Sequence, residues 1–169
     1  FMVYNVGVLQ ENTPLIYLFG GISAMITAQI VGKLSDRFGK RQVFVLSAII
    51  STFFVFFITN MPVMPLFIVL VTFAIWFSTA TGRTVPGQAM TTQAVTLQTR
   101  GSFMSLNSCV QSLGSGLATL MSGWITYSDT KYAIHNYHIL GYISIILISI
   151  SIAMSYRLDR LILVHLSQH

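Results

Sequence analysis

Long runs of apolar residues, separated by short polar segments, dominate the chain. Five runs approach the ~20 residues that a helix needs to cross a bilayer, and they cover residues 14–34, 42–59, 65–82, 101–127 and 139–156. Membrane strands would instead alternate polar and apolar residues, and the second and fifth runs show no such alternation. The pattern therefore predicts an all-α membrane protein whose residues 1–169 form a single membrane domain.

Local signals suggest where these helices begin and end. Pro14 suits the first turn of a helix, and Thr13 can cap that turn. Helix-breaking residues separate the second run from the third: Asn60, Pro62 and Pro65. Residues 1–9 are interpreted as the end of an earlier helix, so the sequence is read as entered partway through a longer one.

The composition identifies lipid as the solvent of this chain. Hydrophobic residues make up 54% and charged residues 8%, whereas soluble domains carry about 25% charged residues. The mean hydropathy of +0.74 agrees with this. The net charge of +5 does not indicate a nucleic-acid partner, because the cations lie between apolar runs and form no basic stripe with interleaved aromatic residues.

The basic residues predict the orientation in the membrane. If the loops alternate sides, eight of the nine Lys and Arg residues fall on one side and only Lys131 on the other. Cytoplasmic loops carry an excess of Lys and Arg. Residues 34–41, residues 83–100 and the C-terminus are therefore predicted to be cytoplasmic in a multi-pass protein of the inner or plasma membrane.

The loop between the first two runs has a distinctive spacing of glycine, acid and base. Gly32 would let the helix end lie close to a neighbour, and Gly39 can adopt the positive φ of a tight turn. Asp36 is the only acid in a dense basic loop, where it can pair with an arginine. The bland alternative is a short basic anchor. The motif consists of Gly32, Asp36, Arg37, Gly39, Lys40 and Arg41.

This loop closely resembles the signature loop of the major facilitator superfamily (MFS). A second stretch, residues 83–123, resembles the tenth-to-eleventh helix region of bacterial sugar or drug efflux permeases. The resemblance implies a C-terminal six-helix half, with five helices and the end of a sixth. It also implies a missing N-terminal six-helix half as partner, and solute transport by alternating access.

The resemblance further implies a gate at the cytoplasmic side. Asp36 matches the acid that locks this side in the family, and Arg37 matches the neighbouring basic position. Arg83 follows the third run, where the family's other half often has an arginine facing this acid. An Asp36–Arg83 contact is therefore expected.

Polar residues within the runs are candidates for the solute path. Asn107 and Gln111 lie four residues apart, on one helix face. Amides both donate and accept, which suits a neutral or polyhydroxy small molecule. The alternative is hydrogen bonding between helices, worth about 0.6 kcal/mol on average in membranes. The full candidate set is Gln29, Ser78, Asn107, Gln111 and Ser115.

Other chemistry finds little support in the sequence. There is no phosphate-binding glycine loop, no metalloprotease motif and no serine with a His and an acid placed to activate it. His135, His138 and Asp129 lie in one loop, without the Cys or Glu that would complete a metal site. We expect no cofactor, no metal and no enzyme. The alternative to a transporter is a truncated, non-transporting half that acts as a membrane-embedded interaction partner.

Overall fold

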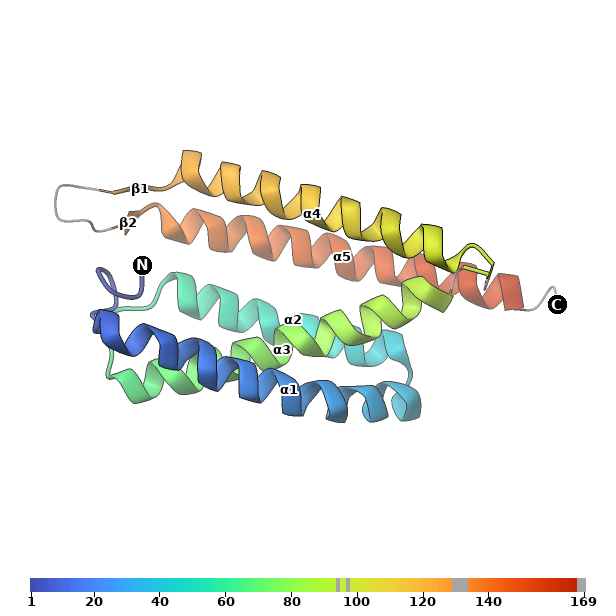
Figure 1. Ribbon diagram of the computed structural model, residues 1–169, viewed down its shortest axis with the longest axis horizontal. Helices are drawn as coiled ribbons and strands as arrows, with labels where there is room; N and C mark the ends of the chain where they lie inside the picture. Colours follow the sequence, from blue (N-terminus) through green and yellow to red (C-terminus); the bar gives the residue numbers. More distant parts are fainter. Residues whose placement is uncertain (94, 97, 129–133, 167–169) are drawn as a thin grey trace.

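Five long helices run back and forth along one axis of the molecule (Figure 1). The computed structural model describes residues 1–93, 95–96, 98–128 and 134–166, with side chains up to residue 157. The helices are α1 (Thr13–Phe38), α2 (Lys40–Thr59), α3 (Leu66–Gln93), α4 (Arg100–Ile125) and α5 (Tyr137–Leu166). A short 3-10 helix, η1 (Gln10–Asn12), precedes α1, and the strands β1 (Tyr127–Ser128) and β2 (Ile134–His135) pair antiparallel between α4 and α5.

A helix occupies each of the five predicted runs, although several ends differ. Thr13 is the first residue of α1 rather than its cap, and its side chain makes no capping hydrogen bond. The fourth predicted run was too long, because α4 ends at Ile125 and Tyr127 belongs to β1.

Four of the described helical segments are long and apolar enough to cross a membrane: Gln10–Phe38, Lys40–Thr59, Leu66–Gln93 and Tyr137–Arg157. The segments are the η1–α1 unit, α2, α3 and most of α5. The remaining helix, α4, has 26 residues, or about 39 Å at 1.5 Å per residue, so it has the length but is less apolar. A fifth span at α4 therefore stays a prediction.

The predicted end of the third helix, at residue 82, was too early. The helix continues beyond residue 82 to Gln93, with Pro86 inside it. A proline removes one backbone hydrogen bond within a helix. Here it lies on a buried face with Gly82 and Met90, each four residues away, so packing against neighbouring helices keeps this stretch helical.

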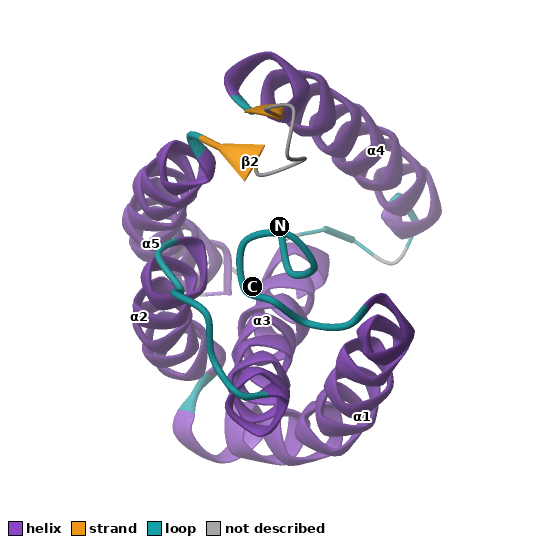
Figure 2. Ribbon diagram, turned by 90° about the vertical axis from the view of Figure 1, so that its left-hand side faces the viewer, coloured by secondary structure: helices purple, strands orange, loops and turns teal. Residues whose placement is uncertain are grey.

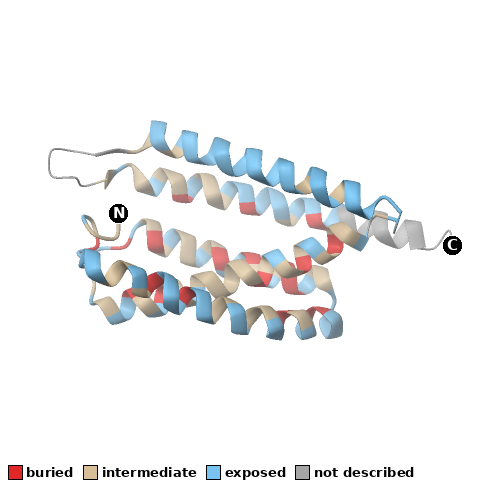
Figure 3. Cartoon of the chain, viewed as in Figure 1, coloured by how far each residue is buried: buried red, intermediate tan, exposed pale blue. Residues whose placement is uncertain are grey.

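Helix α3 is the centre of a tightly packed group. It contacts α1 and α2 extensively, and α2 also packs against α5. By contrast, α4 makes few contacts, mainly with α5, and stands apart from α1 and α3 in the end view (Figure 2). None of the residues of α4, all of which are described, is buried, and the helix is exposed along its length (Figure 3).

Residues 1–9 do not continue a helix, which corrects the prediction. They form turns that fold over the end of the bundle where α1 begins. Val6 and Val8 are buried there in an apolar core with Ile16 and Val69. Gly7 between them has a φ of 81°, a region that favours glycine, so the backbone reverses and both valines reach the core.

The side chain of Asn5 joins this N-terminal segment to the hairpin. Its Nδ2 donates to the carbonyl oxygen of Ile134 at 2.9 Å, and the backbone N–H of Ile134 donates to Asn5 Oδ1 at 2.9 Å. Phe1 also stacks on Tyr137, with ring centroids 4.1 Å apart. Two chain segments far apart in sequence are thus fastened at this end of the bundle.

Replacing Asn5 with alanine is expected to release the hairpin. The change removes two hydrogen bonds, each worth about 1 kcal/mol net. Hydrogen–deuterium exchange of the Ile134 amide should become several-fold faster. Asn60→Ala is the matched control, since that side chain donates only within its own helix end, to Phe56 and Thr59. Unchanged exchange at Ile134 in Asn5→Ala would contradict this fastening role.

Candidate functional site

A cavity of about 650 Å³ lies between α2, α3, α4 and α5. It occupies the half of the bundle that contains the α1–α2 connection and the end of α3, because Phe44 is near the start of α2 and Thr91 is near the end of α3. This is the half predicted to face the cytoplasm. The lining residues are Phe44, Arg83, Thr84, Gly87, Gln88, Met90, Thr91, Asn107, Gln111, Ser151, Met154 and Ser155.

Helix α3 supplies half of this lining through its spacing. Positions 83, 84, 87, 88, 90 and 91 line the cavity, and side chains three and four residues apart share a helix face. On another side of α3, a Cβ at Gly82 would come within 2.7 Å of Ser47 Oγ. The absence of a side chain at Gly82 lets α3 approach α2 and positions Arg83 beside the cavity.

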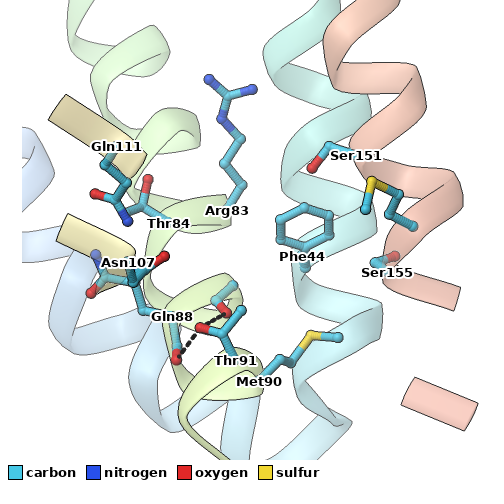
Figure 4. A pocket seen from close by; sticks show the side chains of 12 residues that line it. Phe44, Arg83, Thr84, Gln88, Met90, Thr91, Asn107, Gln111, Ser151 and Ser155 are labelled. Carbon is cyan, nitrogen blue, oxygen red and sulfur yellow. Dashed lines mark hydrogen bonds between the residues drawn. The ribbon is translucent and has the colours of Figure 1, made fainter. Parts of the chain in front are cut away.

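Helix α4 contributes two amides that the sequence spacing had paired. Asn107 and Gln111 both line the cavity from α4 (Figure 4). No hydrogen bond joins their side chains to another described residue. The third candidate on this helix, Ser115, does not line the cavity, and its hydroxyl donates to the carbonyl of Ser112 at 2.9 Å.

The remaining candidates for the solute path lie elsewhere. Gln29 is exposed on α1 and Ser78 is half-buried on α3, and neither lines the cavity. The structure therefore brings together two of the five predicted residues, Asn107 and Gln111, and separates the other three from them.

Polar cavity residues that were missed come from two helices. Thr84, Gln88 and Thr91 lie on the part of α3 that was interpreted as a loop, and Ser151 and Ser155 lie on α5. The threonine hydroxyls donate within α3, from Thr84 to Ala80 at 2.8 Å and from Thr91 to Gln88 at 2.9 Å. Thr84, Gln88 and Thr91 are four and three residues apart, which places them on one face of a helix. This spacing was the sequence signal that could have identified them.

Arg83 extends into the space between the amides of α4 and Ser151 of α5 (Figure 4). Its side chain is half-buried. The predicted Asp36–Arg83 contact is wrong for this structure, since no ion pair joins the two described side chains and Asp36 is exposed near the end of α1. The reason is the length of α3: Arg83 lies inside the helix, well before its end at Gln93.

The signature motif forms the junction of two helices. Gly39 alone separates α1 from α2, with a φ of 92° and a ψ of 136°, which confirms the predicted positive φ. At Gly32, however, no described atom lies within 4 Å of the place that a Cβ would occupy, so the predicted close approach at Gly32 is wrong within the described residues. Arg37 lies over the Phe38 ring at 5.4 Å.

The basic residues that follow Gly39 begin α2 and secure it to α5. Lys40 is the first residue of α2. The guanidinium of Arg41 lies over the Tyr156 ring, 4.9 Å from its centroid. Such cation–π contacts contribute about 0.5–1 kcal/mol at exposed sites, so this pair joins the start of α2 to α5.

Metal binding gains no support from the described residues, which contain no group of three His, Cys, Asp or Glu side chains suited to an ion. His135 and His138 flank the start of α5. Asp129, the acid considered with them, lies outside the described residues.

These features define a multi-pass α-helical membrane protein with a cavity between its helices that both polar and apolar side chains line. The model of the Major Facilitator Superfamily matches residues 6–161. The chain belongs to this superfamily, whose members are transporters. No curated protein matches the chain.

Proposed function

We propose that this chain is the C-terminal six-helix half of a secondary-active efflux permease that exports a small solute by alternating access. The observation that carries the proposal is the cavity of about 650 Å³ between apolar helices. The side-chain amides of Asn107 and Gln111 line it and make no hydrogen bond to another described residue. Ligand sites commonly have volumes of about 300–1,000 Å³ and a few convergent polar groups. Membership of a transporter superfamily supports the same function.

A second protein half completes the proposed site. Solute in such carriers lies near the midplane between two halves, which rock against each other. The exposure of α4 along its length supports this, because the surface of α4 that faces away from the cavity has no packing partner among the described residues. We propose the N-terminal six-helix half as that partner, with lipid around both halves and no nucleic acid.

The signature motif is proposed as the cytoplasmic gate, with the C-terminus on the same side of an inner or plasma membrane. Asp36 is exposed, so its carboxylate is accessible to a basic group or a helix N-terminus of the other half. Gly39 and Arg41 then hold the motif in place, through the tight turn and the Tyr156 contact.

Transport by everted membrane vesicles of the full-length protein tests the proposal. Uptake of labelled sugars and drugs should require an ion gradient and should fall about tenfold in Asn107→Ala/Gln111→Ala. Two lost hydrogen bonds of about 0.7 kcal/mol each, within the usual net range of such bonds, account for a change of this size, since 1.4 kcal/mol corresponds to tenfold. The control Gln42→Ala/Asn60→Ala removes two exposed amides outside the cavity and should transport normally.

The alternative function is that of a truncated, non-transporting half that acts as an interaction partner in the membrane. The exposure of α4 favours a protein partner in this case too. The upstream reading frame separates the two: six further membrane spans in frame support the permease. Vesicles that take up no solute of the panel, although the folded protein is present, would contradict the permease.

A further inference from the structure

We propose that Arg83 makes the cavity selective for small organic anions that also carry hydroxyl groups. This inference rests on the proposed transport function. The first observation is the direction of the side chain: Arg83 is half-buried and extends into the cavity between α4 and α5 (Figure 4). The close approach of α3 to α2 at Gly82 fixes the position of the Arg83 backbone.

The second observation is the charge of the cavity. Among the described residues that line it, Arg83 is the only charged one, and the other eleven are apolar, hydroxyl, amide or glycine residues. A guanidinium does not lose its proton in proteins. The cavity therefore carries a positive charge that none of its described lining residues neutralises.

The chain offers Arg83 no counter-ion among its described acids. Glu11 lies in η1, at the other end of α1, and Asp36 is exposed on the last turns of α1. Neither forms an ion pair with Arg83. Ionised residues within membrane segments are costly, and they pair with other charges or mark the path of a substrate. A bound anion supplies the missing charge.

The third observation concerns the neighbouring polar groups. The amides of Gln88, Asn107 and Gln111 have no hydrogen-bond partner among the described residues, and each both donates and accepts. Hydroxyl groups match such amides. The guanidinium binds carboxylate or phosphate with two parallel hydrogen bonds. A sugar acid or a sugar phosphate combines the two features in a molecule of suitable size.

Matched probes test this directly on the purified full-length protein. D-Gluconate and sorbitol have similar size and hydroxyl groups, but only gluconate is charged; glucose 6-phosphate and glucose form a second pair. We expect gluconate or glucose 6-phosphate to raise the melting temperature of the protein. The neutral compound of each pair, sorbitol or glucose, should bind with at least tenfold lower affinity. In Arg83→Gln the anion should bind about 10- to 100-fold more weakly, as for a lost hydrogen bond to a charged group, and Arg83→Lys should recover part of this.

Controls distinguish a solute from other sources of negative charge. Arg100→Gln removes an exposed cation outside the cavity and should leave binding unchanged. The titrations are repeated in vesicles of phosphatidylcholine alone and with phosphatidylglycerol. Saturation of Arg83 by phosphatidylglycerol, without any effect of the soluble anions, would identify a lipid headgroup and overturn the proposal.

Other outcomes also decide. Equal binding of gluconate and sorbitol, or anion binding that survives in folded Arg83→Gln, overturns the proposal. So does the failure of both anions to bind the folded wild-type protein. If the wild type and Arg83→Gln transport neutral solutes equally and neither binds the anions, the proposed transport function is supported and the proposed anion site is contradicted. If gluconate binding depends on Arg83 but no solute is transported, the anion site is supported and the transport function is contradicted.

Discussion

Replacing Gly141 with leucine is expected to separate α2 from α5 and to destabilise the protein by about 1–3 kcal/mol, the usual cost of overpacking. Gly141 is buried at the contact of these helices. A Cβ there would lie 2.9 Å from both Cβ and Cγ2 of Thr59. Thr59 cannot turn aside easily, because its hydroxyl donates to the carbonyl of Val55 at 2.9 Å. Heating the detergent-solubilised protein stepwise and measuring the monodisperse fraction gives the change in stability.

Gly21→Leu provides the control for this substitution. It adds the same side chain at a helical glycine in a predicted membrane span, but nothing lies within 4 Å of a Cβ at Gly21. This variant should keep the wild-type melting temperature or exceed it, since leucine is a better helix former than glycine. Equal destabilisation of the two variants would show that the α2–α5 contact is not the cause.

Replacing Gly39 with alanine is expected to cost about 1–3 kcal/mol for a different reason. Nothing lies within 4 Å of a Cβ at Gly39, so space is not limiting. The backbone angles of 92° and 136° are the constraint, because residues with a Cβ are strained in such glycine regions. The expected result is a lower melting temperature. The backbone N–H of residue 39, which donates to the carbonyl oxygen of Ser35, should also exchange its hydrogen faster.

The other glycine of the motif should respond in the opposite way. Gly32 lies inside α1 without a close neighbour, so alanine should stabilise the helix by up to about 1 kcal/mol. Gly32→Ala thus serves as the control for Gly39→Ala. If Gly32→Ala is stable yet transports poorly, its place in the motif reflects contact with another part of the transporter. Destabilisation by Gly32→Ala would contradict the open environment seen here.

The positions of the helices were predictable because the apolar runs are long and their polar breaks are sharp. For α2, the pattern extended almost to the observed ends, from Lys40 to Thr59. The prediction failed for α3 because Pro86 and the polar residues after it resemble a loop in isolation. Burial of Gly82, Pro86 and Met90 against other helices is a tertiary effect that no local pattern contains.

The site was predictable in part for the same reason. The four-residue spacing of Asn107 and Gln111 is a local property of one helix, so the sequence placed them together. Their meeting with Arg83 and Ser151 depends on how four helices pack. The error in the length of α3 also misplaced Arg83, and the expected contact with Asp36 failed with it. Residues 1–9 illustrate the same limit, because their turn depends on the core that Val6 enters.

The one-residue connection between α1 and α2 has a mechanical consequence. A single residue spans at most about 3.6 Å, which is less than the 5.4 Å rise of one helical turn. Neither helix can therefore slide past the other by a full turn without unwinding its own end. During any conformational cycle, the ends of α1 and α2 that meet at Gly39 must therefore move together, and probes placed beside Gly39 on the two helices should report the same displacement.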